Sequence, residues 1–277
     1  MKTKGIKVIC GSAIVAMLAA SIPAYAGSTD VFGELTSDFK YTANNGTEDA
    51  QDMLSAPFKF RLDMLAQPKV YFTLLGAGAM LGTAFALDNT MRSHIRGMSN
   101  GAASALEDAG TYSLSAGAGL IYLAGLVTDN DRARHYMITT GAGVAGAELI
   151  TLIFKYGFGR LRPEQGHGST AFFDQGQSFV SGETTPVFAL ATGISAYYDY
   201  KWWIAMPCYS AAVAVGLGRM GHDAHWFSDV VGSGLVGVGT TELLLYMHKE
   251  HEDNPTHYWI FPMATPKGGG VSVGYDW

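Results

Sequence analysis

Six long apolar segments, separated by short polar stretches, dominate the chain from residue 70 onward. Each is about 15 to 20 residues long and rich in Gly and Ala, a length that suits a helix rather than a strand. Strict alternation of apolar and polar residues, the mark of a half-buried strand, is scarce in them. The pattern therefore predicts an all-α fold with a six-helix core bundle. The segments are residues 70–87, 111–127, 136–154, 184–198, 202–218 and 230–247.

The two ends of the chain differ from this core. Residues 1–26 carry three lysines, then an apolar stretch, then small residues at 24–26, which is typical of a secretory signal peptide. Residues 27–66 are polar and mixed, and we expect them to form an N-terminal lead-in that wraps a helical domain of residues 67–250. In the tail, residues 251–277, apolar and small or polar side chains alternate from Val271 onward, which favours a short extended segment.

Composition and charge limit the classes of function. Hydrophobic residues make up 48% of the 277 residues and charged residues only 15%, which fits one domain with an ample core. Without the signal peptide the chain has 15 basic side chains (18 less its three lysines) against 24 acidic ones, a net charge of about −9, so a nucleic-acid partner is not expected. Cys208 is then the one cysteine left, which excludes an intramolecular disulfide and a thiolate metal cluster. The eight histidines show no metal-ligand spacing such as HExxH, so we expect no metal and no other cofactor.

One histidine and one aspartate carry a spacing with chemical meaning. His225 and Asp229 stand at i and i+4, and on a helix they would share one face. The carboxylate would then accept the proton of one ring nitrogen and leave the other nitrogen unprotonated. A histidine oriented in this way can act as a nucleophile.

Basic and small residues in the same region of the sequence are of the kinds that bind a phosphoryl group. Lys155, Arg162 and Arg219 would supply three positive charges to oxygens that share the charge of a phosphoryl transition state. Ser181 adds a hydroxyl, and Gly182 lets a backbone N–H approach an oxygen with no side chain in the way. Because an antiparallel bundle brings alternate helix ends together, these residues are expected to meet at one end of it.

These residues fall in three ordered motifs that resemble those of the type 2 phosphatidic acid phosphatase superfamily. Residues 155–163 fit KxxxxxxRP, residues 178–184 resemble SFPSGHT, and residues 218–229 resemble SRxxxxxHxxxD. The superfamily also holds bacterial class A acid phosphatases, glucose-6-phosphatase and vanadium haloperoxidases. The resemblance covers roughly residues 70 to 247. It implies the six-helix phosphatase/haloperoxidase bundle, a metal-independent phosphatase and a phosphohistidine formed on His225.

The chain departs from the family pattern at three positions. Gly218 replaces the first serine of the third motif, and Val180 replaces the proline of the second. Glu183 replaces the histidine that handles the leaving-group side of the phosphate in the family. A glutamic acid can act as a general acid only if its pKa rises from about 4.3 toward neutrality. His222 and His167 are the other candidates for the missing proton donor.

The apolar segments are compatible with two cellular locations of the protein. Six segments of this length could span a bilayer, but Glu148 and Glu242 lie inside two of them, at a cost of a few kcal/mol each unless buried against a partner. A cleaved signal followed by three spans would also place the first motif in the cytoplasm, whereas membrane members of the family are expected to carry the site on the outer side. We therefore expect an exported protein of the periplasm or cell envelope, either soluble or peripherally associated with the membrane, with an integral membrane protein as the alternative.

Three hypotheses for the function follow. The first is a phosphatase that acts on a phosphate monoester or a lipid phosphate, with His225 and Asp229 as catalytic residues and Glu183 handling the leaving-group proton. The second is a catalytically weakened phosphate-binding protein, in which Glu183 has replaced the working histidine. The third, a vanadate-dependent haloperoxidase, fits a chain of this length poorly. Oligomeric state is not determined by the sequence.

Overall fold

The computed structural model describes residues 31, 33–42, 46, 68–253, 257–265 and 268–276, with side chains described up to residue 249. The expected signal peptide, residues 1–26, and most of the lead-in of residues 27–66 lie outside the described residues. Residues 33–42 of the lead-in are helical. Their Asp38 carboxylate is buried and accepts a hydrogen bond of 3.0 Å from Arg134 Nε, so this part of the lead-in packs on the core.

Each of the six apolar segments coincides with one helix, which confirms the prediction of an all-α bundle. The helices extend beyond the apolar segments, because polar residues at their ends still form helical turns. A short 3₁₀ helix, η2, connects α5 to the second motif. The elements are α3 (Pro68–Ile95), α4 (Asn100–Thr128), α5 (Asp131–Phe158), η2 (Pro163–Gln165), α6 (Thr184–Tyr197), α7 (Trp202–Gly221) and α8 (Phe227–Asp253).

Side-chain and glycine caps fix where α4 and α5 begin and end. Ser99 Oγ accepts the N–H of Ala102 at 3.3 Å, and Asn130 Oδ1 accepts the N–H of Ala133 at 3.1 Å, so both helices have an N-cap. At its other end α5 stops at Gly159, whose φ of 50° is left-handed and whose N–H returns to the carbonyl of Lys155. The first motif therefore begins in the last turn of α5 and turns sharply out of it.

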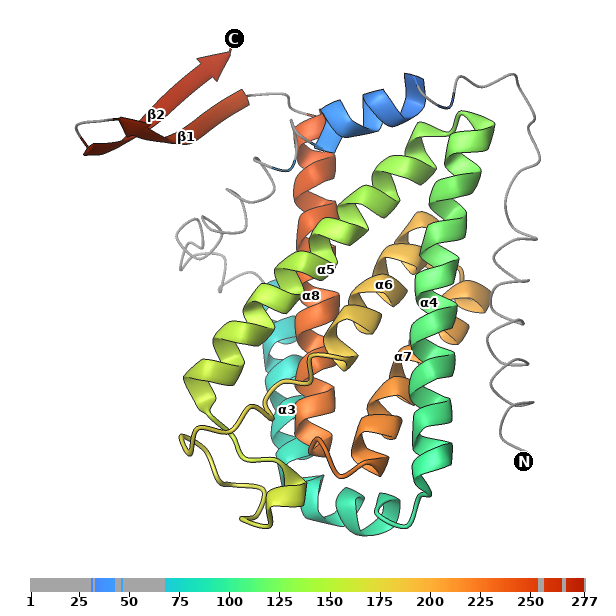
Figure 1. The fold of residues 1–277 in the computed structure, drawn as a ribbon, viewed down its shortest axis with the longest axis vertical. Coiled ribbons are helices and arrows are strands. Elements are labelled where there is room, and N and C mark those ends of the chain that lie inside the picture. Colours follow the sequence, from blue (N-terminus) through green and yellow to red (C-terminus); the bar gives the residue numbers. More distant parts are fainter. Residues whose placement is uncertain are drawn as a thin grey trace.

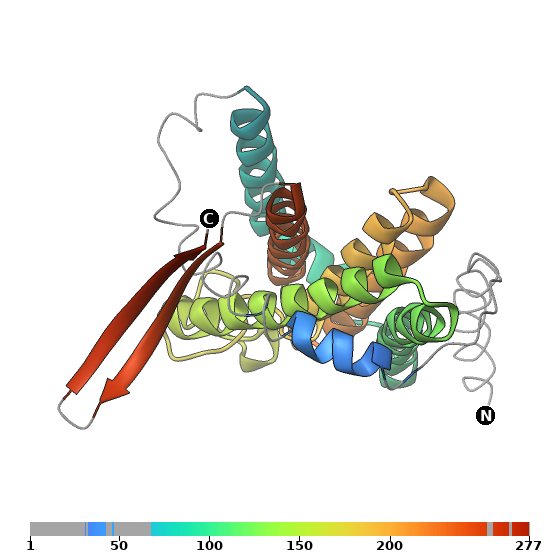
Figure 2. The same ribbon diagram turned by 90° about the horizontal axis from the view of Figure 1, so that it is seen from above.

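The helices run alternately up and down the bundle (Figure 1). Helix α4 packs along α7, and α5 and α6 both pack on α8. Helix α3 lies beside α8 at the edge of the bundle, as the view from above shows (Figure 2). This order brings the C-terminal ends of α5 and α7 next to the N-terminal ends of α6 and α8.

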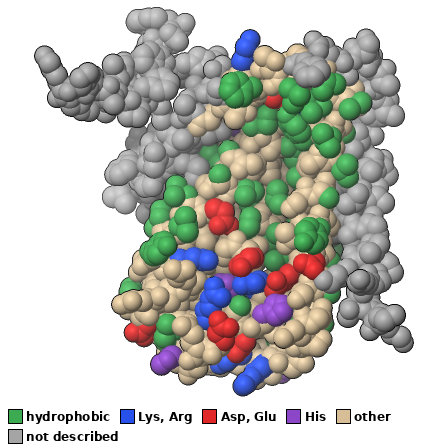
Figure 3. Space-filling model, viewed as in Figure 1, with side chains coloured by type: hydrophobic (Ala, Val, Ile, Leu, Met, Phe, Trp, Pro, Cys, Tyr) green, Lys and Arg blue, Asp and Glu red, His purple; other side chains and the backbone are tan. Residues whose placement is uncertain are grey.

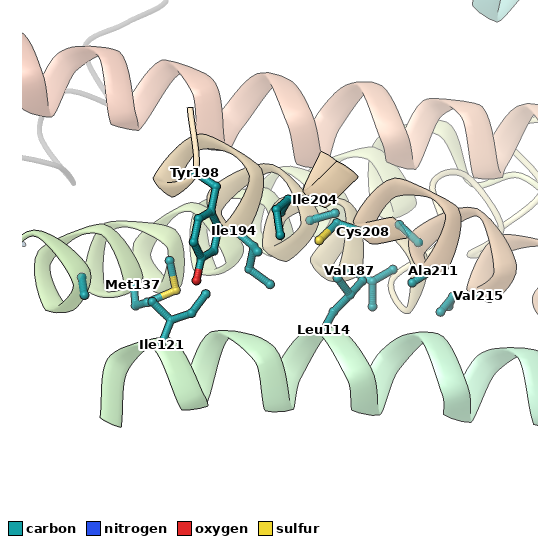
Figure 4. Close-up of a cluster of buried hydrophobic side chains, with 13 residues drawn as sticks. Leu114, Ile121, Met137, Val187, Ile194, Tyr198, Ile204, Cys208, Ala211 and Val215 are labelled. Carbon is teal, nitrogen blue, oxygen red and sulfur yellow. The ribbon is translucent and has the colours of Figure 1, made fainter. Parts of the chain in front are cut away.

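The core lies between α4, α5, α6 and α7 (Figure 4). Leu114 and Ile121 of α4 face Val187 and Ile194 of α6, and all four side chains are buried. Cys208 of α7 lies in the same cluster and is 1% exposed, so its thiol is part of the core.

The richness in Gly and Ala reflects close helix packing. A Cβ atom at Gly110 of α4 would lie 2.4 Å from the carbonyl oxygen of Ala211 on α7. At Gly237 of α8 it would lie 2.5 Å from the carbonyl oxygen of Thr185 on α6. Real Cβ atoms do not approach backbone oxygens this closely, so only glycine permits these two crossings.

Four of the helices are long and apolar enough to cross a membrane, namely those that include residues 71–95, 100–128, 131–165 and 227–249. Helix α6 has only 14 residues, too few for the hydrocarbon core of a bilayer, where about 20 are needed. The six possible spans of the sequence therefore reduce to four candidates in the described chain. Large apolar side chains are exposed on the outer faces of these helices, among them Phe72, Leu75, Ile153 and Tyr246.

The C-terminal tail is extended, as predicted, but it forms a hairpin rather than one segment. Strand β1 (His257–Thr265) pairs antiparallel with β2 (Gly268–Asp276), with Ile260 opposite Val273. The alternating residues from Val271 onward lie in β2. Strand β1 escaped prediction because Pro262, which cannot donate a ladder hydrogen bond, interrupts its pattern.

Candidate active site

The three motifs meet at one end of the bundle, where α5 and α7 end and α6 and α8 begin (Figure 1). Basic, acidic and histidine side chains gather on the surface at this end, whereas the middle of the same face shows mainly hydrophobic side chains and few charged ones (Figure 3). The convergence that the sequence predicts is therefore present. The site is a cluster of charges beneath an apolar helical body.

His225 lies in the connection between α7 and α8, not on a helix. Its ring is 2% exposed, and Nδ1 lies 2.9 Å from the carbonyl oxygen of Ser178. Because a carbonyl only accepts, Nδ1 carries the proton, and Nε2 has a lone pair. Among the described residues Nε2 has no hydrogen-bond partner, since the nearest carboxylate oxygen, Oε2 of Glu183, is 3.8 Å away.

The expected pairing of His225 and Asp229 on one helical face needs correction. Helix α8 begins at Phe227, so His225 precedes it, and Asp229 Oδ2 lies 3.6 Å from Nδ1. The nearer acceptor is the Ser178 carbonyl from the second motif. The ring is thus oriented by a backbone carbonyl, with the carboxylate next to it as a charge partner.

Asp229 holds the loop that carries His225. Its buried carboxylate accepts the N–H of Trp226 at 2.8 Å and the hydroxyl of Ser178 at 2.5 Å. An acidic residue in the first turn of a helix that accepts the N–H three residues earlier is one half of a capping box. Asp229 therefore joins the start of α8 to the second motif.

Arg160 is a site residue that the motif spacing, which selects Arg162, does not reveal. Its side chain is completely buried, and Nη1 donates to Asp229 Oδ1 at 2.5 Å. On the other side Nη2 donates to Asp88 Oδ2 at 2.6 Å. Asp88 is the acid that directly follows the first apolar segment. Its position there was the available signal, but nothing in the sequence links it to residues 140 positions later.

Arg162 occupies a different environment. It precedes η2, its side chain is 33% exposed, and its closest ion-pair partner is Glu164, 3.9 Å away. Its backbone N–H donates to the side chain of Gln165. The motif spacing places Arg162 at the same end of the bundle as the other site residues, with its guanidinium on the outside.

Arg219 is held between two carboxylates. Its Nη2 lies 3.0 Å from Oε1 of Glu183, and its Nη1 lies 3.6 Å from Oε2 of Glu107. Its Nε is buried and has no hydrogen-bond partner among the described residues. Glu107, a residue that the sequence analysis missed, also lies 3.6 Å from Nε2 of His222. His222 is thus near the site, whereas His167 is exposed.

The packing of α4 on α7 explains why position 218 is a glycine. A Cβ at Gly218 would lie 2.5 Å from Cγ of Glu107 and 2.7 Å from the carbonyl oxygen of Ala103. A serine therefore does not fit while Glu107 reaches Arg219. Glycine at position 218 therefore leaves the space that the side chain of Glu107 occupies.

Lys155 and Gly182 lie together, as the motifs imply. A Cβ at Gly182 would be 3.0 Å from Nζ of Lys155 and 3.9 Å from Oε2 of Glu148, so both charged groups lie over the glycine backbone. Glu148 is two helical turns before Lys155 on α5 and faces the site. Glu148, whose burial in an apolar segment would otherwise cost free energy, is therefore directed toward the ammonium group of Lys155.

Ser181 is buried beneath the start of α6. Its hydroxyl oxygen accepts hydrogen bonds from Oγ1 and the N–H of Thr184, at 2.9 and 3.3 Å. Its backbone N–H donates to Ser233 Oγ at 2.8 Å. These bonds hold Ser181 at the start of α6. None of them uses the hydroxyl proton of Ser181, so this proton can be donated to an anion at the helix N-terminus.

Glu183 is half exposed and negatively charged. Contact with the His225 ring when that ring is protonated, and then the Arg219 guanidinium, hold the pKa of its carboxyl down to about 2, against the opposing effect of burial. The raised pKa that a general acid needs is therefore absent while Glu183 contacts Arg219. Its carboxylate lies between Arg219 and Nε2 of His225, where an anionic ligand of the site would bind.

Among the residues that the structure describes, one group of acids could hold a cation, and it is remote from this site. Glu34, Asp129 and Asp131 cluster near the turn between α4 and α5, at the opposite end of the bundle. Arg134 forms ion pairs with Glu34 and Asp131, so a guanidinium already neutralises the cluster.

Comparison with known proteins shows what this arrangement is similar to. Residues 136–253, which include all three motifs, match the PAP2 superfamily. This part of the chain is therefore similar to that superfamily. It is also 34% identical over 105 residues to the lipid A 1-phosphatase of Porphyromonas gingivalis. That match covers 38% of this chain but only 22% of the relative's length, and no solved structure matches the chain.

Proposed function

We propose that this protein is a phosphatase of the PAP2 superfamily that hydrolyses a phosphate monoester, with a lipid phosphate as its substrate, through a phosphohistidine on His225. One observation carries the proposal. Nε2 of His225 is buried, bears a lone pair and has no hydrogen-bond partner in the described chain. An imidazole nitrogen in this state next to a guanidinium is suited to attack an electrophilic phosphorus.

The reaction has two displacements at phosphorus. First, Nε2 of His225 attacks, the N–P bond forms and the P–O bond to the alcohol breaks, so the alcohol oxygen leaves with the electron pair and gains a proton. Then a water molecule attacks the phosphohistidine, the N–P bond breaks, and phosphate is released as the water loses a proton. His225 is cationic between the two steps, with Nδ1 still bonded to the Ser178 carbonyl and Asp229 beside it.

The basic residues neutralise the phosphoryl oxygens. Lys155 lies over the Gly182 backbone. Arg219 contacts Glu183, whose carboxylate is next to His225. We assign the partly exposed Arg162 to the same anion. The N–H of Gly182 and the hydroxyl of Ser181 donate at the N-terminus of α6, whose helix dipole also favours an anion. Donors fixed in this way before the reaction stabilise the charge that develops in the transition state.

Glu183 handles protons only after the substrate displaces it. In the free site it is ionised and bound to Arg219. A bound phosphate takes over Arg219 and brings its own negative charge near Glu183, which raises the affinity of the carboxylate for a proton. We assign Glu183 to the transfer of a proton to the leaving alcohol and from the attacking water.

A lipid phosphate is the substrate that agrees best with the surroundings of the site. Leu152, Ile153 and Tyr156 are exposed on α5 within one turn of Lys155. Apolar side chains directly beside a cationic group suit a molecule that carries acyl chains and a phosphate. The relative named a lipid A 1-phosphatase and the four helices of membrane-spanning length point to the same class. We propose that the protein is exported and acts at the membrane, outside the cytoplasm.

Replacement of the nucleophile tests the chemistry. His225→Ala should abolish phosphate release, whereas His167→Ala, on an exposed loop histidine, should not. A phosphohistidine is labile in acid, so quenching with acid would destroy it. The labelled intermediate is therefore sought under alkaline conditions. Activity retained in His225→Ala would exclude this mechanism. Rates on a detergent-dispersed lipid phosphate and on a soluble aryl phosphate then separate the two substrate classes, and a preference for the soluble ester would exclude the lipid assignment.

A weakened phosphate-binding protein is the second candidate, because the Glu183 carboxylate lies where the phosphate would bind. Glu183→His restores the family motif and decides between the two. A large gain in turnover indicates a weakened enzyme, whereas a loss shows that Glu183 participates in this variant of the site. The haloperoxidase alternative is tested by halide oxidation in the presence of vanadate.

A further inference from the structure

We propose that Asp88, Arg160 and Ser228 form a buried charge network that positions Asp229 and stabilises a positive charge on His225. The inference rests on the proposed function, because it concerns the cationic state that His225 passes through. Asp88 comes from α3, Arg160 from the loop after α5 and Ser228 from α8. They are positioning residues, since each acts on His225 through Asp229.

The hydrogen bonds of Asp88 establish that it is a carboxylate acceptor. Its Oδ1 accepts the N–H of Ser228 at 2.8 Å, and its Oδ2 accepts the hydroxyl of Ser228 at 2.8 Å and Nη2 of Arg160 at 2.6 Å. All three partners are donors, so no proton on Asp88 is needed to complete the network. The side chains of Asp88 and Arg160 are both 0% exposed.

Arg160 is held rigidly between the two carboxylates. Nη1 donates to Asp229 and to Ser228 Oγ, the latter at 2.7 Å, while Nε and Nη2 both donate to the carbonyl of Ser169, at 3.1 and 2.6 Å. The rings of Phe85, Phe172 and Trp226 lie around the guanidinium, with centroids 5.1, 4.9 and 5.4 Å from Cζ. These rings exclude water, so the charges interact strongly.

The charges of the network do not cancel. Asp88 and Asp229 contribute two negative charges and Arg160 one positive charge, which leaves one negative charge buried. An uncompensated buried charge is costly, and the next group that can compensate it is the ring of His225, 3.6 Å from Asp229. The network is therefore better balanced when His225 is cationic, as in the phosphohistidine, than when it is neutral. Such a preference favours the intermediate over the resting state.

The other charged groups near His225 lie on the opposite side of its ring. They face Nε2 and the substrate, they are partly exposed, and their charges are rearranged when a phosphate binds. The buried network faces Nδ1, and its Asp88, Arg160 and Asp229 side chains are buried away from any bound phosphate. The groups on the substrate side are Glu183 at the start of α6, Arg219 of α7, Lys155 and Glu148 of α5, Glu107 of α4, and His222 of the α7–α8 connection.

Asp88→Asn removes the excess negative charge and keeps the shape of the side chain. The acidic limb of the kcat/KM profile should move to lower pH by about one unit, the effect expected of one charge in a site of effective dielectric about 20. The turnover number should fall at least about tenfold, with a smaller change in KM. Asp223→Asn is the matched control, because Asp223 also pairs with an arginine of α3, Arg92 at 2.6 Å, but not with Arg160. It should leave the acidic limb in place.

Two further measurements keep the test decisive. If Asp88→Asn does not fold, Ser228→Ala removes one donor to Asp88 without a change of charge and should lower turnover while leaving the acidic limb in place. The pH at which the labelled ring of His225 titrates in the magnetic resonance spectrum reports on the network without any activity. An unchanged ring titration in folded Asp88→Asn overturns this inference. A phosphatase that survives His225→Ala overturns the proposed function instead.

Discussion

In the proposed mechanism Glu183 competes with the substrate for Arg219, so its replacement should tighten the binding of a phosphate analogue. In the free site Oε1 of Glu183 lies 3.0 Å from Nη2 of Arg219, and Oε2 lies 3.8 Å from Nε2 of His225. These are the two groups that a phosphoryl oxygen and the phosphorus must approach. A phosphate therefore binds only after the carboxylate leaves, and the free energy of that displacement reduces the apparent affinity.

The size of the effect follows from the charge stabilisation of Glu183. Its pKa is lowered from 4.5 to about 2. At about 1.36 kcal/mol per unit, this corresponds to ~3.4 kcal/mol of interaction with its surroundings. Since 52% of the side chain is exposed, solvent screening reduces the figure, and we take ~1.5 kcal/mol as the effective value. Glu183→Gln should therefore bind the analogue about tenfold more tightly.

Orthovanadate is the appropriate probe, because it is tetrahedral when free and can become five-coordinate when it binds the histidine nitrogen. Its dissociation constant is measured by calorimetry for the wild type, Glu183→Gln and Glu183→Ala. Glu164→Gln is the matched control, since Glu164 is 54% exposed and lies 3.9 Å from Arg162, but does not contact Arg219. It should change the affinity less than twofold, because an exposed pair of this kind contributes little.

The expected pattern is tighter binding with slower turnover, because Glu183→Gln removes both the competitor and the proton carrier. The reasoning is wrong if both Glu183 variants bind vanadate with unchanged or weaker affinity while the fold is intact. In that case Glu183 contributes to the anion site instead of occupying it.

Three further outcomes are expected. Gly218→Ser should lower the melting temperature, since overpacking of this kind costs about 1–3 kcal/mol, and Glu107→Ala in the same chain should restore part of the loss, as measured by thermal unfolding. The folded-state pKa of Glu183 is depressed, so its contribution to stability is present above about pH 4.5 and is lost as the pH falls toward 2; urea unfolding at several pH values should show this loss in the wild type and not in Glu183→Gln. Treatment with a metal chelator should leave phosphate release unchanged, since the proposed mechanism uses no metal, and a loss restored by added zinc or magnesium would contradict it.

The bundle was predictable because its six helices are encoded in length and composition. Each apolar segment is too long for a strand, and polar residues or helix caps such as Asn130 separate it from the next segment. The helix ends were less predictable, since polar residues continue α3 beyond residue 87 to Ile95. The hairpin of the tail was not predicted, because its first strand contains Pro262.

The site was predictable only where motif spacing identifies residues. Lys155, Arg219 and His225 are brought together as the motifs require. The residues that were missed are single acids on apolar helices, Asp88, Glu107 and Glu148, and their meaning depends on which helix faces which. Arg160 and Arg162 show the same limit, because spacing within a motif does not reveal which guanidinium is buried.

Two of the three departures from the family motifs act on the same arginine. Gly218 makes room for Glu107 on one side of Arg219, and Glu183 lies on the other. Arg219 is therefore neutralised in the free site by carboxylates of this chain. Binding of a phosphate is then an exchange of one anion for another, which disfavours weakly charged ligands. Under the proposed function, a substrate succeeds when it also gains free energy elsewhere, and the exposed apolar side chains beside Lys155 would provide that gain for a lipid and not for free phosphate.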